Sequence, residues 1–94
     1  MKSERFEWDD AKAAVNAAKH RVSFEQAQLV FDDIFAIEKI DDEASYREQR
    51  VSVVGMSGAR LLQVAYTMRG DRIRIISARG AEPYEKRLYH NQKA

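Results

Sequence analysis

The chain has 94 residues, 45% of them hydrophobic and 33% charged, with a formal net charge of +1, which is typical of one globular domain covering residues 1–94. It contains no cysteine, which excludes disulfides and thiolate metal sites. No apolar run approaches the roughly 18 residues of a membrane span, and the N-terminus lacks a signal-peptide pattern, so we expect a cytoplasmic protein with no membrane partner.

The charges are unevenly distributed along the chain. Residues 1–59 carry eight basic and twelve acidic side chains, whereas residues 60–94 carry eight and three. The basic C-terminal third is a candidate surface for phosphate groups, and the acidic part would equally suit a basic protein partner.

The N-terminal half predicts two helices. Asp9 or Asp10 caps a first helix that runs to about His20. Its expected apolar stripe is Ala11, Ala14, Val15 and Ala18. Ser23 and Gln26 form a capping box for a second helix. The stripe of that helix is Phe24, Ala27, Val30, Phe31 and Ile34. The connection is so short that we expect a helical hairpin.

The C-terminal half predicts mainly sheet. Strands are expected over residues 35–40, 49–54, 60–68 and 71–79, joined by short glycine-containing turns that indicate antiparallel pairing. The segment 41–45 predicts an acidic loop, and 81–92 a polar helix anchored by Tyr84 and Leu88. The fold class is therefore α+β, with a helical hairpin on a four-stranded antiparallel sheet, or five-stranded if Phe6–Trp8 adds an edge strand.

The segment 71–79 has the strongest strand signal, because β-branched residues dominate it. The period of two places Ile73, Ile75, Ser77 and Arg79 on one face and Arg72, Arg74, Ile76 and Ala78 on the other. Arg79 ends this strand, where it can present a fixed fork of donors to an anion. A solvated or salt-bridged arginine is the alternative interpretation.

The available chemistry indicates phosphate chemistry without a metal or other cofactor. The sequence has no glycine-rich phosphate loop and no serine nucleophile elbow, and His20 and His90 do not have metal-ligand spacing. Arginine can neutralise charge that develops on a phosphate, and Tyr, Lys or Glu can move the proton of a ribose 2′-hydroxyl. Trp8, Tyr84 and Tyr89 can stack on unpaired bases. A protein-binding module would use the same residue types.

Several segments together resemble the BrnT family of toxins. Those in the N-terminal half are Phe6–Asp9, Lys12, Asn16, Lys19, His20, Val22–Ala27 and Val30–Asp32. Those in the C-terminal half are Arg50, Gly55, Tyr66, Thr67, Arg74–Arg79, Ala81, Glu85 and Tyr89. One departure is Arg21, which stands where the family often has glycine.

This resemblance implies a RelE-like fold and a type II toxin that acts as a metal-independent endoribonuclease and inhibits translation. The implied partners are an RNA substrate and a BrnA-like ribbon-helix-helix antitoxin, through which the complex binds operator DNA. The expected catalytic residues are Arg60, Arg79, Glu85 and Tyr89. The expected RNA-binding residues are Lys19, His20, Arg72 and Arg74. The alternative function is a non-catalytic binding subunit of such a repressor complex.

Overall fold

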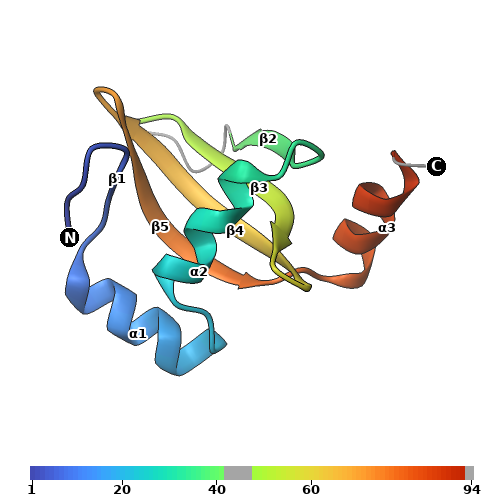
Figure 1. Ribbon diagram of the computed structural model, residues 1–94, viewed down its shortest axis with the longest axis horizontal. Helices are drawn as coiled ribbons and strands as arrows, with labels where there is room; N and C mark the ends of the chain where they lie inside the picture. Colours follow the sequence, from blue (N-terminus) through green and yellow to red (C-terminus); the bar gives the residue numbers. More distant parts are fainter. Residues whose placement is uncertain (42–47, 93–94) are drawn as a thin grey trace.

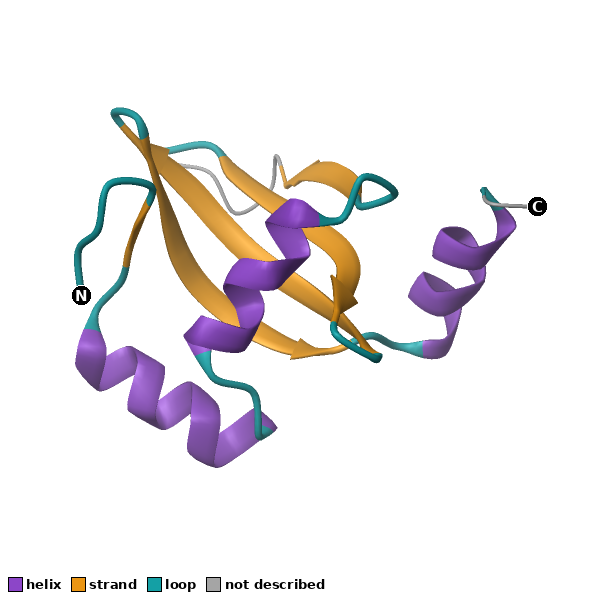
Figure 2. Cartoon of the chain, in the orientation of Figure 1, coloured by secondary structure: helices purple, strands orange, loops and turns teal. Residues whose placement is uncertain are grey.

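The computed structural model describes residues 1–41 and 48–92, and its order of elements confirms an α+β fold with a C-terminal helix (Figures 1 and 2). The elements are β1 (Phe6–Glu7), α1 (Asp10–His20), α2 (Phe24–Gln28), the 3-10 helix η1 (Leu29–Asp32), β2 (Ile37–Asp41), β3 (Arg50–Ser57), β4 (Arg60–Arg69), β5 (Arg72–Gly80) and α3 (Pro83–Asn91). Most of the predicted acidic loop 41–45 lies outside the described residues.

The strands form one sheet of five, in the order β1-β5-β4-β3-β2. The expectation of purely antiparallel pairing is wrong for one pair, because β1 runs parallel to β5, with Phe6 opposite Ile73. The other three pairs are antiparallel as predicted. β1 and β5 come from opposite ends of the chain, so no hairpin turn fixes their relative direction.

The N-terminal caps form as predicted, but a helical hairpin is not confirmed. The Asp9 side chain accepts a hydrogen bond from the Lys12 backbone, and Ser23 and Gln26 form the expected capping box. α2 has only five residues and continues as η1. Figure 1 shows α1 beside β5, whereas α2 and η1 cross the sheet toward β3.

The main core lies between the sheet and the N-terminal helices. Its fully buried members include Phe24, Val53, Leu62 and Val64. Edge-to-face ring contacts join Phe6 to Phe31, Phe31 to Tyr66, and Trp8 to Phe24. A second, smaller cluster on the opposite face contains Val54, Leu61 and Tyr89, and it attaches α3 to the sheet.

The predicted apolar stripe of α1 is wrong. Ala11, Ala14, Val15 and Ala18 are exposed, Val15 by 67%, and the one buried residue of the helix is Asn16. The Asn16 Nδ2 donates to the carbonyls of Val22 and Ala78 at 3.0 and 2.9 Å, and its Oδ1 accepts from the Ala78 N–H at 3.1 Å. The two bonds to Ala78 satisfy backbone groups on the edge of β5 that β1 does not cover, so a polar residue of α1 faces the sheet here. Ile34, predicted to extend the second stripe, is 89% exposed.

The predicted division of the β5 side chains between two faces is correct only for the first half of the strand. The register with β4 shifts between Ala65 and Tyr66, with Tyr66 opposite Ile75 but Ala65 opposite Ser77. The additional residue, Ile76, forms a β-bulge in β5. Beyond it, each side chain points to the face opposite to the one that a regular strand would give it. Ala78 is therefore buried in the core with Ile75, and Arg79 faces the opposite side.

The predicted anchors of α3 are also wrong, because Tyr84 and Leu88 are 51% and 58% exposed. The buried residues of this helix are Glu85 and Tyr89, four positions apart and therefore on one face. Both satisfy their polar atoms inside the protein, which allows them to replace apolar anchors.

Arg21 ends α1 in the left-handed conformation, with φ of 57° and ψ of 37°. It is the one non-glycine residue with positive φ among those the structure describes. This conformation costs an ordinary side chain about 1–2 kcal/mol, a cost that glycine at this position would avoid.

Candidate active site

The sheet face that points away from α1 and α2 carries the polar side chains of the candidate site; we call it the open face. Strand pairing places Lys39 beside Ser52, and Gln63 beside Arg79. Their backbone neighbours Val53, Val64 and Ala78 point into the main core. Because side chains alternate along a strand, these four polar residues share the open face.

Arg79 lies in a pocket of about 500 Å³ on the open face, which we call the Arg79 pocket. Its lining residues come from β2, β3, β4, β5 and α3, and they are Lys39, Ile40, Asp41, Ser52, Gln63, Arg79, Tyr84 and Glu85. The rigid sheet supplies the floor, and α3 supplies one wall. This arrangement concentrates polar groups from distant parts of the sequence around one arginine.

Arg79 and Glu85 form a two-point ion pair across this pocket. The Arg79 Nη1 donates to Glu85 Oε1 at 2.9 Å, and Nη2 donates to Oε2 at 3.1 Å. Nη1 also donates to the Gly80 carbonyl at 3.0 Å, and Glu82 lies 3.8 Å from Nη2. The planar guanidinium is therefore held in one orientation by the start of α3.

The same geometry leaves part of the guanidinium open. A guanidinium has five N–H donors, and the described residues accept hydrogen bonds from three of them. The remaining two, on Nε and Nη2, lie side by side along one edge. The Arg79 side chain is 29% exposed, and two parallel donors of this kind match the spacing of two phosphate oxygens. We call the side of the guanidinium that carries them the open edge.

Glu85 remains a carboxylate because of its neighbours. Burial alone would raise its pKa, but the Arg79 guanidinium and the Glu82 backbone N–H together hold the pKa below its ordinary value. The Glu82 N–H donates to Oε1 at 2.8 Å, and the Tyr84 hydroxyl lies 3.4 Å from Oε2. The hydrogen bonds that Arg79 donates to Glu85 in turn raise the pKa of Arg79. Both members of the pair are charged at neutral pH.

Tyr89 lies away from the Arg79 pocket. Its side chain is 1% exposed, and its hydroxyl donates to Asp33 Oδ2 at 2.5 Å. Asp33 also accepts from the Met56 N–H at 2.8 Å. Burial, followed by the contact with Asp33, raises the pKa of Tyr89 to about 12. This position suits an anchor that attaches α3 to the sheet.

Arg60 lines a different pocket, of about 510 Å³, formed by Met56, Ala59, Arg60, Leu61, Gly80, Ala81, Lys86 and His90. Its Nη1 donates to the Arg21 carbonyl at 3.2 Å. A Cβ atom on Gly80 would lie 3.1 Å from Arg60 Nη2, so the guanidinium rests against the backbone there. The structure does not bring Arg60 into the pocket of Arg79.

The four expected RNA-binding residues fall into two groups. Arg74 forms an ion pair with Glu7 at 2.7 Å, and Arg72 Nε donates to the Ser3 carbonyl at 2.7 Å. Both arginines thereby attach the N-terminal segment to β5. Lys19 and His20 instead line an open groove between α1 and β5.

The sequence analysis did not predict several residues that line the Arg79 pocket and the groove between α1 and β5. Ser52, Gln63 and Lys39 approach Arg79 only through the strand register, which the sequence does not show. Lys12 had a detectable signal, because Lys12, Asn16, Lys19 and His20 recur at helical spacing on one face.

Among the residues that the structure describes, no three His, Asp or Glu side chains are grouped as metal ligands would be. None of the described helices has the length and apolar character of a membrane-spanning segment.

Comparison with known proteins identifies the family. Residues 8–85 match the family described as "Ribonuclease toxin, BrnT, of type II toxin-antitoxin system". No curated protein matches the chain. The matched region covers most of the chain and includes the Arg79–Glu85 pair, and it confirms the resemblance drawn from the sequence. The chain belongs to the BrnT family of ribonuclease toxins of type II toxin–antitoxin systems.

Proposed function

We propose that this toxin is a metal-independent endoribonuclease with a RelE-like fold, which cleaves RNA at the Arg79 pocket and thereby inhibits translation. The observation that carries the proposal is the open edge of Arg79 beside the Glu85 carboxylate. Attack by a ribose 2′-hydroxyl places additional negative charge on the phosphate. Two parallel N–H donors on a fixed guanidinium can bind that charge without a metal ion.

Glu85 acts here as a positioning residue. Its carboxylate holds the Arg79 guanidinium on two atoms, so the open edge has a defined direction before substrate binds. Tyr84 lies at the rim of the same pocket with half of its side chain exposed, where its ring can stack on an unpaired base. Trp8 and Tyr89, the other stacking candidates, are buried.

The experiment that tests this function is cleavage of single-stranded RNA by the purified toxin. We expect fragments with 2′,3′-cyclic phosphate ends, with EDTA present, and growth arrest when the toxin is expressed alone. Absence of cleavage together with normal growth would instead support the non-catalytic binding subunit. Activity that is lost in EDTA and restored by magnesium would contradict the metal-independent mechanism.

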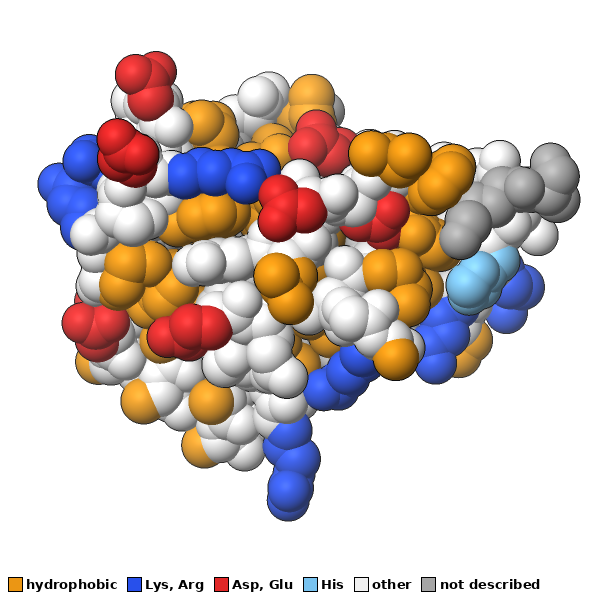
Figure 3. All heavy atoms as spheres, viewed as in Figure 1, with side chains coloured by type: hydrophobic (Ala, Val, Ile, Leu, Met, Phe, Trp, Pro, Cys, Tyr) orange, Lys and Arg blue, Asp and Glu red, His pale blue; other side chains and the backbone are white. Residues whose placement is uncertain are grey.

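The partner that we propose is a BrnA-type antitoxin that covers an apolar surface next to the Arg79 pocket. Exposed hydrophobic side chains gather near β2, the last strand of the sheet, and on α3; they are Ile34, Phe35, Ile40, Tyr84 and Leu88. Figure 3 shows hydrophobic side chains on the surface over the turn that leads into β2. Monomeric proteins rarely expose large contiguous apolar patches, so exposed hydrophobic side chains on these two neighbouring elements favour a partner here.

The shape of this surface links antitoxin binding to inhibition. A pocket of about 300 Å³ between β2 and α3 is lined in part by Ile37, Val54 and Leu88. It shares Lys39, Ser52, Tyr84 and Glu85 with the Arg79 pocket. An antitoxin segment seated there would therefore block access to Arg79. A stable complex of this kind buries at least about 1,000 Å² in total.

The docking surface is testable with matched variants in toxin co-expressed with its antitoxin. Leu88→Glu should prevent co-elution in size-exclusion chromatography, whereas Met68→Glu, at a similarly exposed position on β4, should not. RNA cleavage by the Leu88→Glu protein should persist. If Leu88→Glu still co-elutes with the antitoxin, this surface is not the interface. We further propose that the complex, but not the toxin alone, binds operator DNA, which a gel-shift measurement with each component tests.

A further inference from the structure

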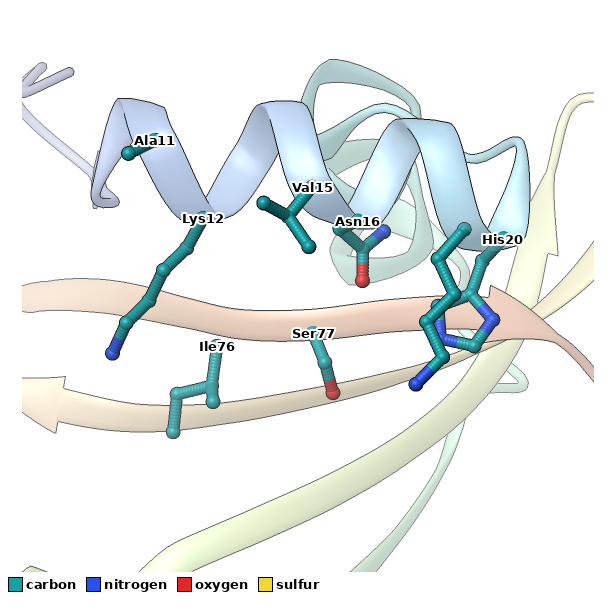
Figure 4. Close-up of a pocket in the computed structure, with 8 residues that line it drawn as sticks. Ala11, Lys12, Val15, Asn16, His20, Ile76 and Ser77 are labelled. Atoms are coloured by element: carbon teal, nitrogen blue, oxygen red, sulfur yellow. The ribbon is translucent and has the colours of Figure 1, made fainter.

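A second concave site lies between α1 and the exposed part of the β5 edge. This α1 groove has a volume of about 370 Å³ and is lined by Ala11, Lys12, Val15, Asn16, Lys19, His20, Ile76 and Ser77. Figure 4 shows Lys12 and His20 pointing from α1 toward β5 at opposite ends of the groove, with Val15 and Asn16 between them. The groove therefore has an apolar centre and a basic rim.

The position of the groove is fixed by the Asn16 hydrogen bonds to Ala78, which hold α1 against β5. Lys12 lies one turn before Asn16 and Lys19 about one turn after it, so both point to the same side of the helix as Asn16. The helix thus presents its cationic groups along the strand edge in a defined arrangement.

The basic side chains of the groove form no salt bridge with the described residues, although the charge of Asp9, at the start of α1, interacts with that of Lys12. The ion pairs formed within the described part of the chain include none that involves Lys12, Lys19 or His20. No acidic residue is among the side chains that line the groove. Val15, two-thirds exposed, and Ile76 supply apolar surface between these basic side chains. Such a surface suits a ligand that combines negative charges with flat apolar rings.

The groove and the Arg79 pocket are lined by neighbouring parts of β5. Ser77 lines the groove and Arg79 lines the pocket, two positions further along β5. Both face the open side, because Ser77 pairs with Ala65 and Arg79 pairs with Gln63. Two residues of a strand span roughly 6.6 Å, so the two sites adjoin on one surface.

We propose that the α1 groove binds the single-stranded RNA next to the scissile phosphate. Lys12, Lys19 and His20 contact successive phosphates, and Val15 and Ile76 contact a base or ribose between them. This inference rests on the proposed ribonuclease function and extends it to a substrate track of three or more nucleotides. The inference also adds Lys12 and Ser77 to the expected RNA-binding residues.

The experiment measures the affinity of the intact toxin for a single-stranded 2′-O-methyl oligonucleotide, which lacks the attacking hydroxyl, at several salt concentrations. Each phosphate contact contributes about 0.7 to the slope of log K against log salt for a single strand. The Lys12→Gln/Lys19→Gln protein should therefore lose about 1.4 from the magnitude of that slope. With cleavable RNA, its KM should rise while kcat remains close to that of the wild type.

A control variant with the same loss of charge separates local contacts from net charge. Lys2 and Arg87 are exposed and line neither site, so Lys2→Gln/Arg87→Gln should leave both the slope and KM nearly unchanged. Circular dichroism of each variant checks that the fold is retained. An equal decrease of the slope in both variants would overturn the proposal, because it would show a general charge effect.

The outcomes also distinguish this inference from the function on which it rests. If the wild type cleaves RNA and the groove variant shows an unchanged slope and KM, the groove proposal is wrong but the ribonuclease function stands. If the groove variant loses affinity for the antitoxin and keeps its KM for RNA, the groove is a protein-binding surface and the proposal is equally wrong. If the wild type neither binds nor cleaves RNA, the groove proposal and the proposed ribonuclease function are both wrong.

Discussion

Asn16 and Ala78 are joined as two neighbouring strands would be, with the side-chain amide of Asn16 in place of a backbone. The amide donates to the Ala78 carbonyl at 2.9 Å and accepts from its N–H at 3.1 Å. β1 pairs with β5 only at Ile73 and Arg74, so Asn16 satisfies the edge near the Arg79 end. One asparagine therefore fixes both the position of α1 and the end of the strand that carries Arg79.

Replacement of Asn16 should destabilise the protein strongly. Asn16→Ala leaves buried backbone groups of Ala78 without partners and removes the bond to Val22, so we expect a loss of about 2–4 kcal/mol in the free energy of unfolding. Val15→Ala, on the exposed side of the same helix, should change stability by less than about 0.5 kcal/mol. Urea denaturation of both variants checks this. Equal effects at the two positions would contradict the role assigned to Asn16.

Replacement of Arg21 by glycine should stabilise the protein. The left-handed backbone at Arg21 strains any side chain with a Cβ atom, and relief of that strain outweighs the extra flexibility of glycine in the unfolded chain. We expect Arg21→Gly to add about 0.5–1 kcal/mol to the free energy of unfolding. Arg21→Ala keeps the Cβ atom and should show no such gain. A gain of the same size in Arg21→Ala would show that the arginine side chain, not the backbone, is responsible.

Tyr89 should make stability sensitive to alkaline pH. Burial and then Asp33 raise its pKa to about 12 in the folded protein, whereas an unfolded tyrosine has a pKa of about 10. The folded state therefore favours the neutral phenol, and the stability from Tyr89 is complete below pH 10 and is lost as pH rises toward 12. Tyr66 shows the same direction, from burial and then Glu38.

The measurement compares wild type with Tyr89→Phe, in which Tyr66 is retained. Between pH 9 and pH 12 the free energy of unfolding of the wild type should fall more steeply than that of Tyr89→Phe. Parallel curves for the two proteins over this range would mean that Tyr89 does not ionise with a raised pKa.

The parts of the fold that the sequence predicted are those governed by local rules. Leu62, Val64 and Tyr66 alternate through β4 and are all buried on one face, as the period of two requires. The Ser23–Gln26 capping box places the start of α2 correctly. These features depend on residues that are close together in the chain, so their pattern is visible in the sequence.

The errors occur where a distant contact determines the outcome. The bulge at Ile76 depends on the register between β4 and β5, and it reversed the side assigned to Ala78. Asn16 is buried because a strand edge 62 residues away needs its amide. Glu85 is buried because Arg79 lies opposite it. Sequence periodicity treats such polar residues as exposed, since it does not include their partners.

The residues of the candidate site could likewise be predicted from the sequence only in part. Arg79 and Glu85 were both named, and the structure brings them together in one ion pair. Arg60, the third predicted catalytic residue, lines another pocket. Tyr89, the fourth, is buried between α3 and the sheet. The strand end that carries Arg79 could be assigned from the pattern, but the buried faces of α1 and α3 and the distances between these elements required the fold.

The central claim is that Arg79 supplies the charge stabilisation for RNA cleavage, and the kcat of Arg79 variants tests it most directly. Loss of one preorganised donor group of this kind typically costs about 10²–10³ in rate, so we expect a decrease of about that size in Arg79→Ala. Arg79→Lys should recover little, because an ammonium lacks the two-point edge. Circular dichroism and antitoxin pull-down must show that each variant remains folded. A folded Arg79→Ala toxin that cleaves RNA at the wild-type rate would contradict the account.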